Sequence, residues 1–211
     1  MESKLFTPVT FGPLTLRNRT IRSAAFESMC PGNAPSDMLL DYHRSVAAGG
    51  IGMTTVAYAA VTQSGLSFDR QLWMRPEIIP GLRRLTDAIH AEGAAAGIQL
   101  GHCGNMSHKS ICGCMPVGAS SGFNLYSPTF VRGLRADELP AMARAYGRSV
   151  NLAREAGFDS VEIHAGHGYL ISQFLSPSTN HRKDEFGGSL QNRMRFMDMV
   201  MEEVMKAAGS D

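Results

Sequence analysis

The sequence predicts an α/β fold in which parallel strands alternate with helices. Apolar stretches of strand length recur along the chain, each is followed by a segment with apolar residues at helical spacing, and glycine closes most of those segments. Strands that follow one another through helices run parallel and are joined by right-handed crossovers. The expected strands are 20–26, 52–61, 95–102 and 160–166, and the expected helices are 36–50, 76–93, 135–157 and 189–209.

Local signals justify these elements in order. Residues 6–19, ahead of the first strand, predict a short β-hairpin that turns near Gly12 and Pro13, and such a hairpin could close one end of a barrel. The first helix begins at Ser36, a preferred N-cap residue, and ends in two glycines. The second helix ends at Gly93 and carries apolar residues at helical spacing, namely Ile79, Leu82, Leu85 and Ile89.

Four β/α units in series fit either a doubly wound sheet or a TIM (β/α)8-type barrel. The glycine fingerprint G-x-G-x-x-G is absent after the first strand, which disfavours a dinucleotide-binding doubly wound sheet. A closed barrel has eight strands and about 250 residues, whereas this sequence has 211 residues and four units. We therefore expect residues 1–211 to form one domain, the N-terminal half of a barrel, which is either truncated or completed by another copy.

The charge balance and the chain start limit the class of protein. The formal net charge is +1, so no excess charge favours nucleic acid or a membrane surface as a partner. The apolar runs are far shorter than a membrane span, and the start MESKLFTPVT lacks the pattern of a signal peptide. We expect a cytoplasmic protein.

The four cysteines predict free thiols. They are too few and too unevenly spaced for a disulfide framework in a chain of this length. One residue separates Cys112 from Cys114, whereas zinc and iron–sulfur pairs usually have two between them. We therefore expect no structural metal at this pair, and reduced thiols in a reducing compartment.

Polar side chains occur near the ends of two predicted strands. In SVEIHAG (160–166), Val161 and Ile163 share one face, so Glu162 and His164 share the other. In the preceding strand, Gln99 alternates with apolar neighbours in the same way. An unpartnered polar group inside a barrel costs about 1–3 kcal/mol, and barrel enzymes keep their active sites at the C-terminal strand ends. The pattern therefore predicts a functional site here.

Two chemistries fit these side chains. His102, His164 and His167, with Cys103 as a fourth candidate, could bind a metal ion. Alternatively, two imidazole donors could hold a substrate oxygen while negative charge develops on it, and the hydroxyl of Tyr169 could transfer a proton. The second chemistry needs an electron donor and hence a cofactor.

A long motif resembles the old yellow enzyme family of FMN-dependent ene-reductases and NADH:flavin oxidoreductases. The family pattern begins H-x-x-[HN]-G-Y-L, which here is His164 to Leu170, and the chain also has LFTP at 5–8 and LRNR at 16–19. The resemblance covers about residues 5–206. The later motif residues are Gln173 to Pro177, Asn180, Arg182, Asp184 to Ser189, Asn192, Arg193, Arg195 and Phe196.

The resemblance implies a flavin enzyme. FMN would lie across the top of the barrel, NADH or NADPH would reduce it, and the substrate would be a carbonyl-conjugated alkene such as an enone, enoate or enoyl thioester. His164 and His167 match the residues that hydrogen-bond the carbonyl oxygen, and Tyr169 matches the residue that donates the proton. The positions that match the FMN contacts are Ser23, Ala24, Ala25, Ala59, Ala60 and Gln99.

The later part of the motif is expected to be structural, with ion pairs of Arg182, Asp184 and Glu185 holding the loop after the fourth strand. Two alternatives to the flavin enzyme stay open: a non-catalytic truncated half-barrel, and a barrel-type metal-dependent hydrolase that uses the histidines. A homo-oligomer is compatible with each of these interpretations. The sequence predicts neither the natural substrate, nor the choice between NADH and NADPH, nor the role of residues 103–134.

Overall fold

The computed structural model describes residues 3–209, so the ends of the predicted domain 1–211 lie outside the described part. Its main sheet has four parallel strands in the order β3-β4-β5-β9. This confirms the predicted α/β fold with parallel strands. The bounds are Ile21–Arg22 for β3, Met53–Ala60 for β4, Ala95–Gly101 for β5 and Ser160–Ile163 for β9.

Strand β3 is much shorter than the predicted strand 20–26, because side chains replace its backbone pairing. Arg22 Nη1 donates to the carbonyl of Thr55 at 2.6 Å, and the amide of Ala57 donates to Glu27 Oε2 at 3.2 Å. Arg22 and Glu27 also form an ion pair of 2.8 Å. The edge of β4 is therefore occupied by two charged side chains beyond Thr54.

The four predicted helices are all present, as α1 (Asp37–Ala48), α2 (Ile79–Ala91), α4 (Leu139–Glu155) and α6 (Leu190–Ala208). The hydroxyl of Ser36 caps α1 by accepting from the amide of Leu39 at 3.2 Å, and Ser189 caps α6 in the same way. Both α2 and α4 begin later than predicted because a short 3-10 turn precedes each. None of the helices in residues 3–209 combines the length and the apolar character that a membrane span needs.

The hydrophobic core lies between the sheet and these helices. Ile98 and Leu100 on β5 point into it and are fully buried, as are Leu82 and Leu85 on α2. The opposite face of the sheet is open: Ile21 is 45% exposed, and Glu162 is exposed as well. The predicted alternation is therefore confirmed for β5 and β9, whose apolar residues face the helices while Gln99 and Glu162 lie on the open face.

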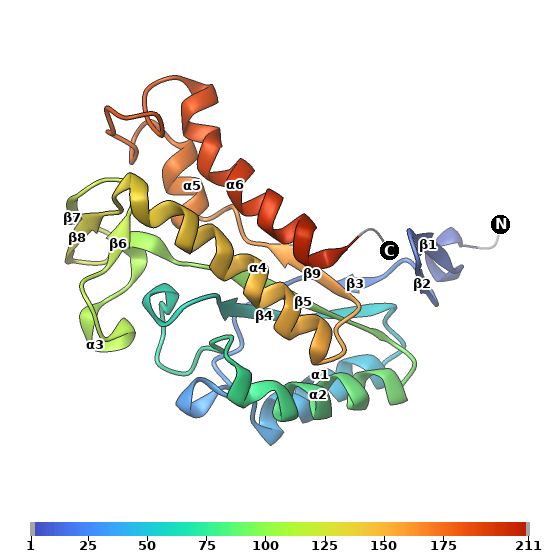
Figure 1. Ribbon diagram of the computed structural model, residues 1–211. Coiled ribbons are helices and arrows are strands. Elements are labelled where there is room, and N and C mark those ends of the chain that lie inside the picture. The colour runs from blue at the N-terminus through green and yellow to red at the C-terminus, as the bar shows by residue number, and fades with distance from the viewer. Residues whose placement is uncertain (1–2, 210–211) are drawn as a thin grey trace.

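The predicted hairpin is also confirmed, as β1 (Val9–Phe11) paired antiparallel with β2 (Leu14–Leu16). Gly12 makes the turn with φ +54°, a conformation that glycine adopts at little cost. Arg17 joins the hairpin to the sheet and its helices by donating to the carbonyls of Ala47, Ile51 and Glu92. Figure 1 shows the hairpin at one end of the sheet and α5 (Leu170–Leu175) at the other.

Residues 103–134 form a small subdomain that the sequence did not predict. It contains the single-turn helix α3 (Lys109–Cys112) and a sheet of β6 (Val117–Gly118), β8 (Thr129–Gly133) and β7 (Gly122–Asn124), in that order. Figure 1 places it near α5, at the same end of the main sheet. The C-terminal strand ends are therefore bordered by this subdomain.

Arg182 ties the long loop before α6 to the subdomain. Its guanidinium donates to the carbonyls of Ala119 and Leu134 and lies against the rings of Phe174 and Phe186. The expected ion pair with Asp184 is present at 2.5 Å. The expectation for Glu185 is wrong, because this carboxylate joins none of the ion pairs among residues 3–209.

Candidate active site

The turn after β9 carries the predicted catalytic residues. The amide of His164 donates to the carbonyl of Leu100 at 2.8 Å, which extends the β5–β9 pairing by one step. His164 therefore lies beside Gly101. A Cβ atom at Gly101 would lie 3.1 Å from both the Cβ of His164 and the ring of Tyr58. Glycine at this position allows the two side chains to approach each other over β5.

His164 and His167 are in direct contact. Nδ1 of His167 lies 3.3 Å from Nε2 of His164, and the two rings meet edge to face with centroids 5.0 Å apart. The amide of Gly166 donates to Nδ1 of His164 at 3.4 Å, which places the proton of a neutral ring on Nε2. His167 has φ +55°, which is unusual for a residue with a side chain and suits a functional turn.

The electrostatics keep His164 neutral. Burial lowers its pKa below the ordinary value of 6.5, and the neighbouring His167 lowers it further, while Glu162 opposes both. A neutral imidazole still offers one N–H donor. Only 8% of His164 is exposed, whereas His167 is exposed, so a ligand at the open end reaches His167 first.

Tyr169 completes the group. Its ring lies 4.7 Å from that of His164, and its backbone amide closes the turn by donating to the carbonyl of Gly166 at 3.1 Å. The hydroxyl of Tyr169 makes no hydrogen bond within residues 3–209, although the residue is half-buried. His164 therefore contacts both His167 and Tyr169, and one turn carries all three side chains.

Gln99 lies on the open face next to these residues. Its Nε2 donates to Glu162 Oε1 at 2.5 Å, across directly paired positions of β5 and β9. This bond fixes the amide and leaves its carbonyl oxygen for another partner. Gly97 and Gly101 flank Gln99 on the same face of β5, but neighbouring side chains lie over both glycines, with Tyr58 and His164 over Gly101. The half-buried amide of Gln99 is therefore the group that this strand offers to the edge of a planar ring.

The other predicted cofactor residues divide into two groups. Ser23 and Ala25 are exposed and Ala24 is half-buried, just after β3 at the C-terminal edge of the sheet. Ala59 and Ala60 have no exposed surface. In this structure the rest of the chain covers both alanines, and their contact with a flavin stays a prediction.

A register shift explains the burial of the two alanines. The pairing of β4 with β5 is irregular between Val56 and Ala59, so the alternation of the strand changes there. Ala59 joins the hydrophobic core, and Tyr58 takes the place beside His164 instead. Sequence alternation alone cannot show such a bulge.

Tyr58 is a site residue that the sequence analysis missed. Its ring lies 5.8 Å from His164 and 5.3 Å from Tyr169, and its hydroxyl lies 2.8 Å from the hydroxyl of Ser67. Burial raises the pKa of Tyr58 well above its ordinary value, so the phenol stays protonated. The signal that could have revealed it is a single aromatic residue in a strand end of small side chains.

Gln173 was named only as a motif residue, and its contacts come from the structure. It is 1% exposed, and its Nε2 donates to the carbonyl of Gly168 at 2.7 Å and to Asn105 Oδ1 at 2.9 Å. It also donates to the carbonyl of Cys103 at 3.1 Å, and its Oε1 accepts from the amide of Asn105 at 3.2 Å. Gln173 therefore binds the histidine turn to the start of the 103–134 subdomain.

The metal-site alternative is not supported, because both ring nitrogens of His102 are bonded to neighbouring groups other than His164 and His167. Its Nδ1 accepts from the amide of Gly104 at 2.9 Å, and its Nε2 lies 3.1 Å from Ser64 Oγ. Burial lowers the pKa of His102 to about 3. The thiol of Cys103 donates to the carbonyl of Leu66 at 3.4 Å. In the described part of the chain, no three histidine, cysteine or acidic side chains are arranged to hold a metal ion.

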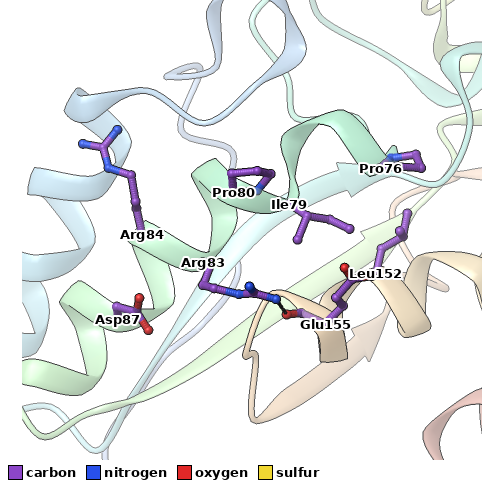
Figure 2. Close-up of a pocket in the computed structure, with 8 residues that line it drawn as sticks. All are labelled: Pro76, Ile79, Pro80, Arg83, Arg84, Asp87, Leu152 and Glu155. Atoms are coloured by element: carbon purple, nitrogen blue, oxygen red, sulfur yellow. Dashed lines mark hydrogen bonds between the residues drawn. The ribbon is translucent and has the colours of Figure 1, made fainter.

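The groove between α2 and α4 has a volume of about 550 Å³, and its lining has no histidine, cysteine or hydroxyl side chain (Figure 2). Its floor is aliphatic, formed by Ile79 and Leu152. Arg83 donates to the backbone carbonyl of Glu155 at 2.7 Å, and Arg84 pairs with Asp37 at 2.9 Å. The groove lies on the helical side of the fold, so the open strand ends remain the candidate active site.

Comparison with known proteins identifies the family. Residues 4–211 match the NADH:flavin oxidoreductase / NADH oxidase family, which is nearly the entire chain. The chain belongs to this family. Its members use FMN with NAD(P)H as reductant, as the sequence resemblance implied.

Two curated relatives and one solved structure illustrate the similarity. The chain is 43% identical over 206 residues to a 4,4'-dithiodibutanoate disulfide reductase of Rhodococcus erythropolis, covering 98% of this chain and 51% of the relative. It is 36% identical over 209 residues to an NADPH dehydrogenase of Bacillus subtilis, covering 97% of this chain and 60% of that protein. The chain thus spans about half to three fifths of the length of these relatives.

The solved structure of the old yellow enzyme homologue from Zymomonas mobilis has the same arrangement. The two structures superpose with a TM-score of 0.91 at 30% sequence identity, over 98% of this chain and 61% of the other. This agreement confirms the α/β fold of the chain.

Proposed function

We propose that this chain is part of an FMN-dependent oxidoreductase that uses NAD(P)H to reduce a C=C bond conjugated to a carbonyl group. The observation that carries the proposal is the group of His164, His167 and Tyr169 at the open strand ends, one strand away from the amide of Gln99. In this proposal the four units belong to a closed eight-stranded barrel.

The residues present fit one edge of the flavin ring. The amide of Gln99, held by Glu162, offers a carbonyl acceptor and a remaining N–H. Ser23 to Ala25 lie at the same edge of the sheet. When bound, FMN would supply hydride transfer between the nicotinamide and the substrate. The protein would orient the substrate and polarise it.

His164 and His167 would hold the carbonyl oxygen. The Nε2–H of His164 is directed to His167 in the structure, and an arriving carbonyl oxygen would take over this donor. His167 would donate from its own N–H to the same oxygen. Two donors at an oxygen that gains negative charge in the transition state contribute about 10²–10³ in rate each. The lowered pKa of His164 keeps it neutral, so it can donate without becoming the acid.

Tyr169 would deliver the proton. Its hydroxyl has no competing partner within residues 3–209, and its ring packs against His164 and Tyr58. This packing restricts the side chain, so the hydroxyl stays close to the bound substrate. The proton would go to the carbon next to the carbonyl group, and solvent would restore it to the phenol.

The test measures cofactor binding and substrate choice separately. We expect the purified protein to bind FMN with quenching of flavin fluorescence and then to oxidise NADPH faster when 2-cyclohexen-1-one is added. Cyclohexanone, which lacks the C=C bond, is the matched control and should add nothing. FMN binding without an enone-dependent rate would contradict the reaction, and no FMN binding by the full-length protein would contradict the whole proposal.

A further inference from the structure

Two cysteines outside the candidate active site lie in contact. All four cysteines fall within residues 3–209 and all are free thiols, which confirms that part of the sequence prediction. The sulfur atoms of Cys112 and Cys114 are 3.8 Å apart, and the thiol of Cys112 donates to the carbonyl of Cys114 at 3.2 Å. The flavin chemistry proposed above uses neither residue.

The backbone brings the two sulfur atoms together. Cys112 is the last residue of α3, and Gly113 follows in the left-handed conformation with φ +74°. This turn reverses the chain and directs the side chain of Cys114 back toward Cys112. A Cβ at Gly113 would meet only the side-chain amide of Gln63, at 3.3 Å, so the glycine is required by its conformation and not by crowding.

The two thiols differ in accessibility. Such a difference suits an exchange in which the exposed thiol reacts first with a small molecule and the buried thiol then reacts with the product. Cys114 is exposed, whereas Cys112 is only 2% exposed. The remaining cysteines are poor competitors. Burial raises the pKa of Cys30 and of Cys103 to about 12, and both are buried, so neither supplies a thiolate at neutral pH.

Cys114 borders a cavity of about 630 Å³, within the range of small-molecule sites. Three arginines and two carboxylates line it, which leaves one net positive charge (three minus two). The arginines are Arg132, Arg135 and Arg148, and the carboxylates are Asp137 and Glu138. The cavity therefore suits a small anionic molecule that places a sulfur atom near Cys114.

We propose that Cys112 and Cys114 form a reversible thiol–disulfide pair that reacts with anionic low-molecular-weight disulfides. The thiolate of Cys114 attacks one sulfur of the small disulfide, the S–S bond breaks, and the first small thiol leaves with the electron pair. The thiolate of Cys112 then attacks Cys114, and the second small thiol leaves. The protein pair loses two electrons and two protons in forming its own S–S bond, and the small disulfide is reduced to two thiols.

The geometry sets two limits on this reaction. The sulfur atoms must approach from 3.8 Å to the length of a disulfide bond, about 2.0 Å. The single-turn helix α3 and the following glycine are short enough to adjust. Burial raises the pKa of Cys114 above its ordinary value of 9.0, the neighbouring Cys112 raises it further, and Arg132 lowers it. The thiolate fraction, and with it the exchange rate, should therefore still be increasing when the pH passes 9.0.

Peptide mapping tests the proposal without any variant. Trypsin cleaves after Lys109 and Arg132, so one peptide, 110–132, carries both cysteines of the pair and no other cysteine. After treatment of the native protein with oxidised glutathione, we expect this peptide to lose two hydrogen atoms and to retain no glutathione. A thiol reductant should restore its mass. An unmodified peptide, or a stable glutathione adduct on Cys114, would overturn the proposal.

Three variants assign the steps. Cys112→Ser should stop the reaction at the glutathione adduct on Cys114, whereas Cys114→Ser should prevent any reaction of the peptide. Gly113→Ala retains both thiols but disfavours the left-handed turn, so formation of the Cys112–Cys114 disulfide should slow about fivefold or more. Disulfide formation in Gly113→Ala at the wild-type rate would contradict the claim that the turn at Gly113 brings the two sulfur atoms together. Enone reduction is measured separately, so the failure of either proposal leaves the other intact.

Discussion

Two histidines follow adjacent strands of the same sheet and have opposite environments. His102 comes directly after β5 and has no exposed surface, with both ring nitrogens in hydrogen bonds to Gly104 and Ser64. His164 comes directly after β9, and its Nε2 faces only the exposed His167. The loop after β4 covers His102, since Gly65 packs so closely that a Cβ there would lie 2.9 Å from the ring.

This difference teaches that position at a strand end does not make a histidine reactive. Both residues occur where barrel enzymes place catalytic groups. Only His164 has a nitrogen whose partner can be exchanged for a substrate atom. His102 uses its two nitrogens to hold the loops after β4 and β5 together. The same residue type thus serves a structural purpose on one strand and a chemical purpose on the next.

The largest expected effect is on catalysis at the contacting pair His164 and His167. His164→Asn and His167→Asn should each lower kcat/KM for an enone about 10²-fold, because each removes a donor to the developing oxyanion. His90→Asn is the matched control, because His90 lies on α2 and pairs with Asp159. Steady-state kinetics checks this prediction. An unchanged kcat/KM in both variants would contradict the claim that His164 and His167 are the reactive histidines.

The buried histidine should instead control acid stability. Its folded-state pKa of about 3 lies below the ordinary 6.5, so the unfolded chain binds more protons between these values and stability falls as the pH drops through this range. In His102→Gln, the free energy of unfolding should depend less steeply on pH, by up to about 1.4 kcal/mol per pH unit. Urea unfolding at several pH values from 7 to 4 measures this dependence. The same dependence in His102→Gln and in the wild type would contradict a lowered pKa of His102.

Gln173 connects the two regions and should have an intermediate effect. In Gln173→Glu a carboxylate would replace an amide that donates to the carbonyls of Gly168 and Cys103. We expect a loss of about 2–3 kcal/mol in the free energy of unfolding and lower enone activity, because the histidine turn loses its support. Gln191→Glu, at an exposed position of α6, is the isosteric control. Equal unfolding curves for the two variants would contradict this assignment.

Gly101 should show the smallest effect. An added methyl group would approach His164 and Tyr58 at 3.1 Å, so both side chains must shift by a few tenths of an ångström. We expect Gly101→Ala to cost about 1 kcal/mol of stability and to reduce activity less than His164→Asn does. At Gly166 a Cβ would lie 3.8 Å from the nearest atom of His164, so Gly166→Ala should be neutral. Thermal unfolding of both variants decides between crowding and a general intolerance of alanine.

The sequence predicted the features that depend on local signals. Ser36 caps the first helix as predicted, because its side chain meets the first turn, and Val161 alternates with Glu162 because β9 is regular. His164, His167 and Tyr169 were predicted as a group, and they lie together because one turn carries all three. Such features need no knowledge of distant parts of the chain.

The features that were missed depend on contacts between distant segments. Ala59 and Ala60 are buried because the pairing of β4 with β5 shifts, which the strand's own sequence does not reveal. The position of Gln173 depends on the conformation of Asn105, which is 68 residues away in the chain. The short strands of the 103–134 subdomain have too few residues to show a period.

The central claim is that the open strand ends hold a flavin and a conjugated carbonyl compound between Gln99 and the two histidines. A crystal structure of the FMN-loaded protein with 2-cyclohexen-1-one tests it most directly. The account predicts the carbonyl oxygen within about 3.2 Å of a ring nitrogen of both His164 and His167, with Gln99 at the flavin edge. A carbonyl oxygen that contacts neither histidine, or a flavin bound elsewhere, would contradict it.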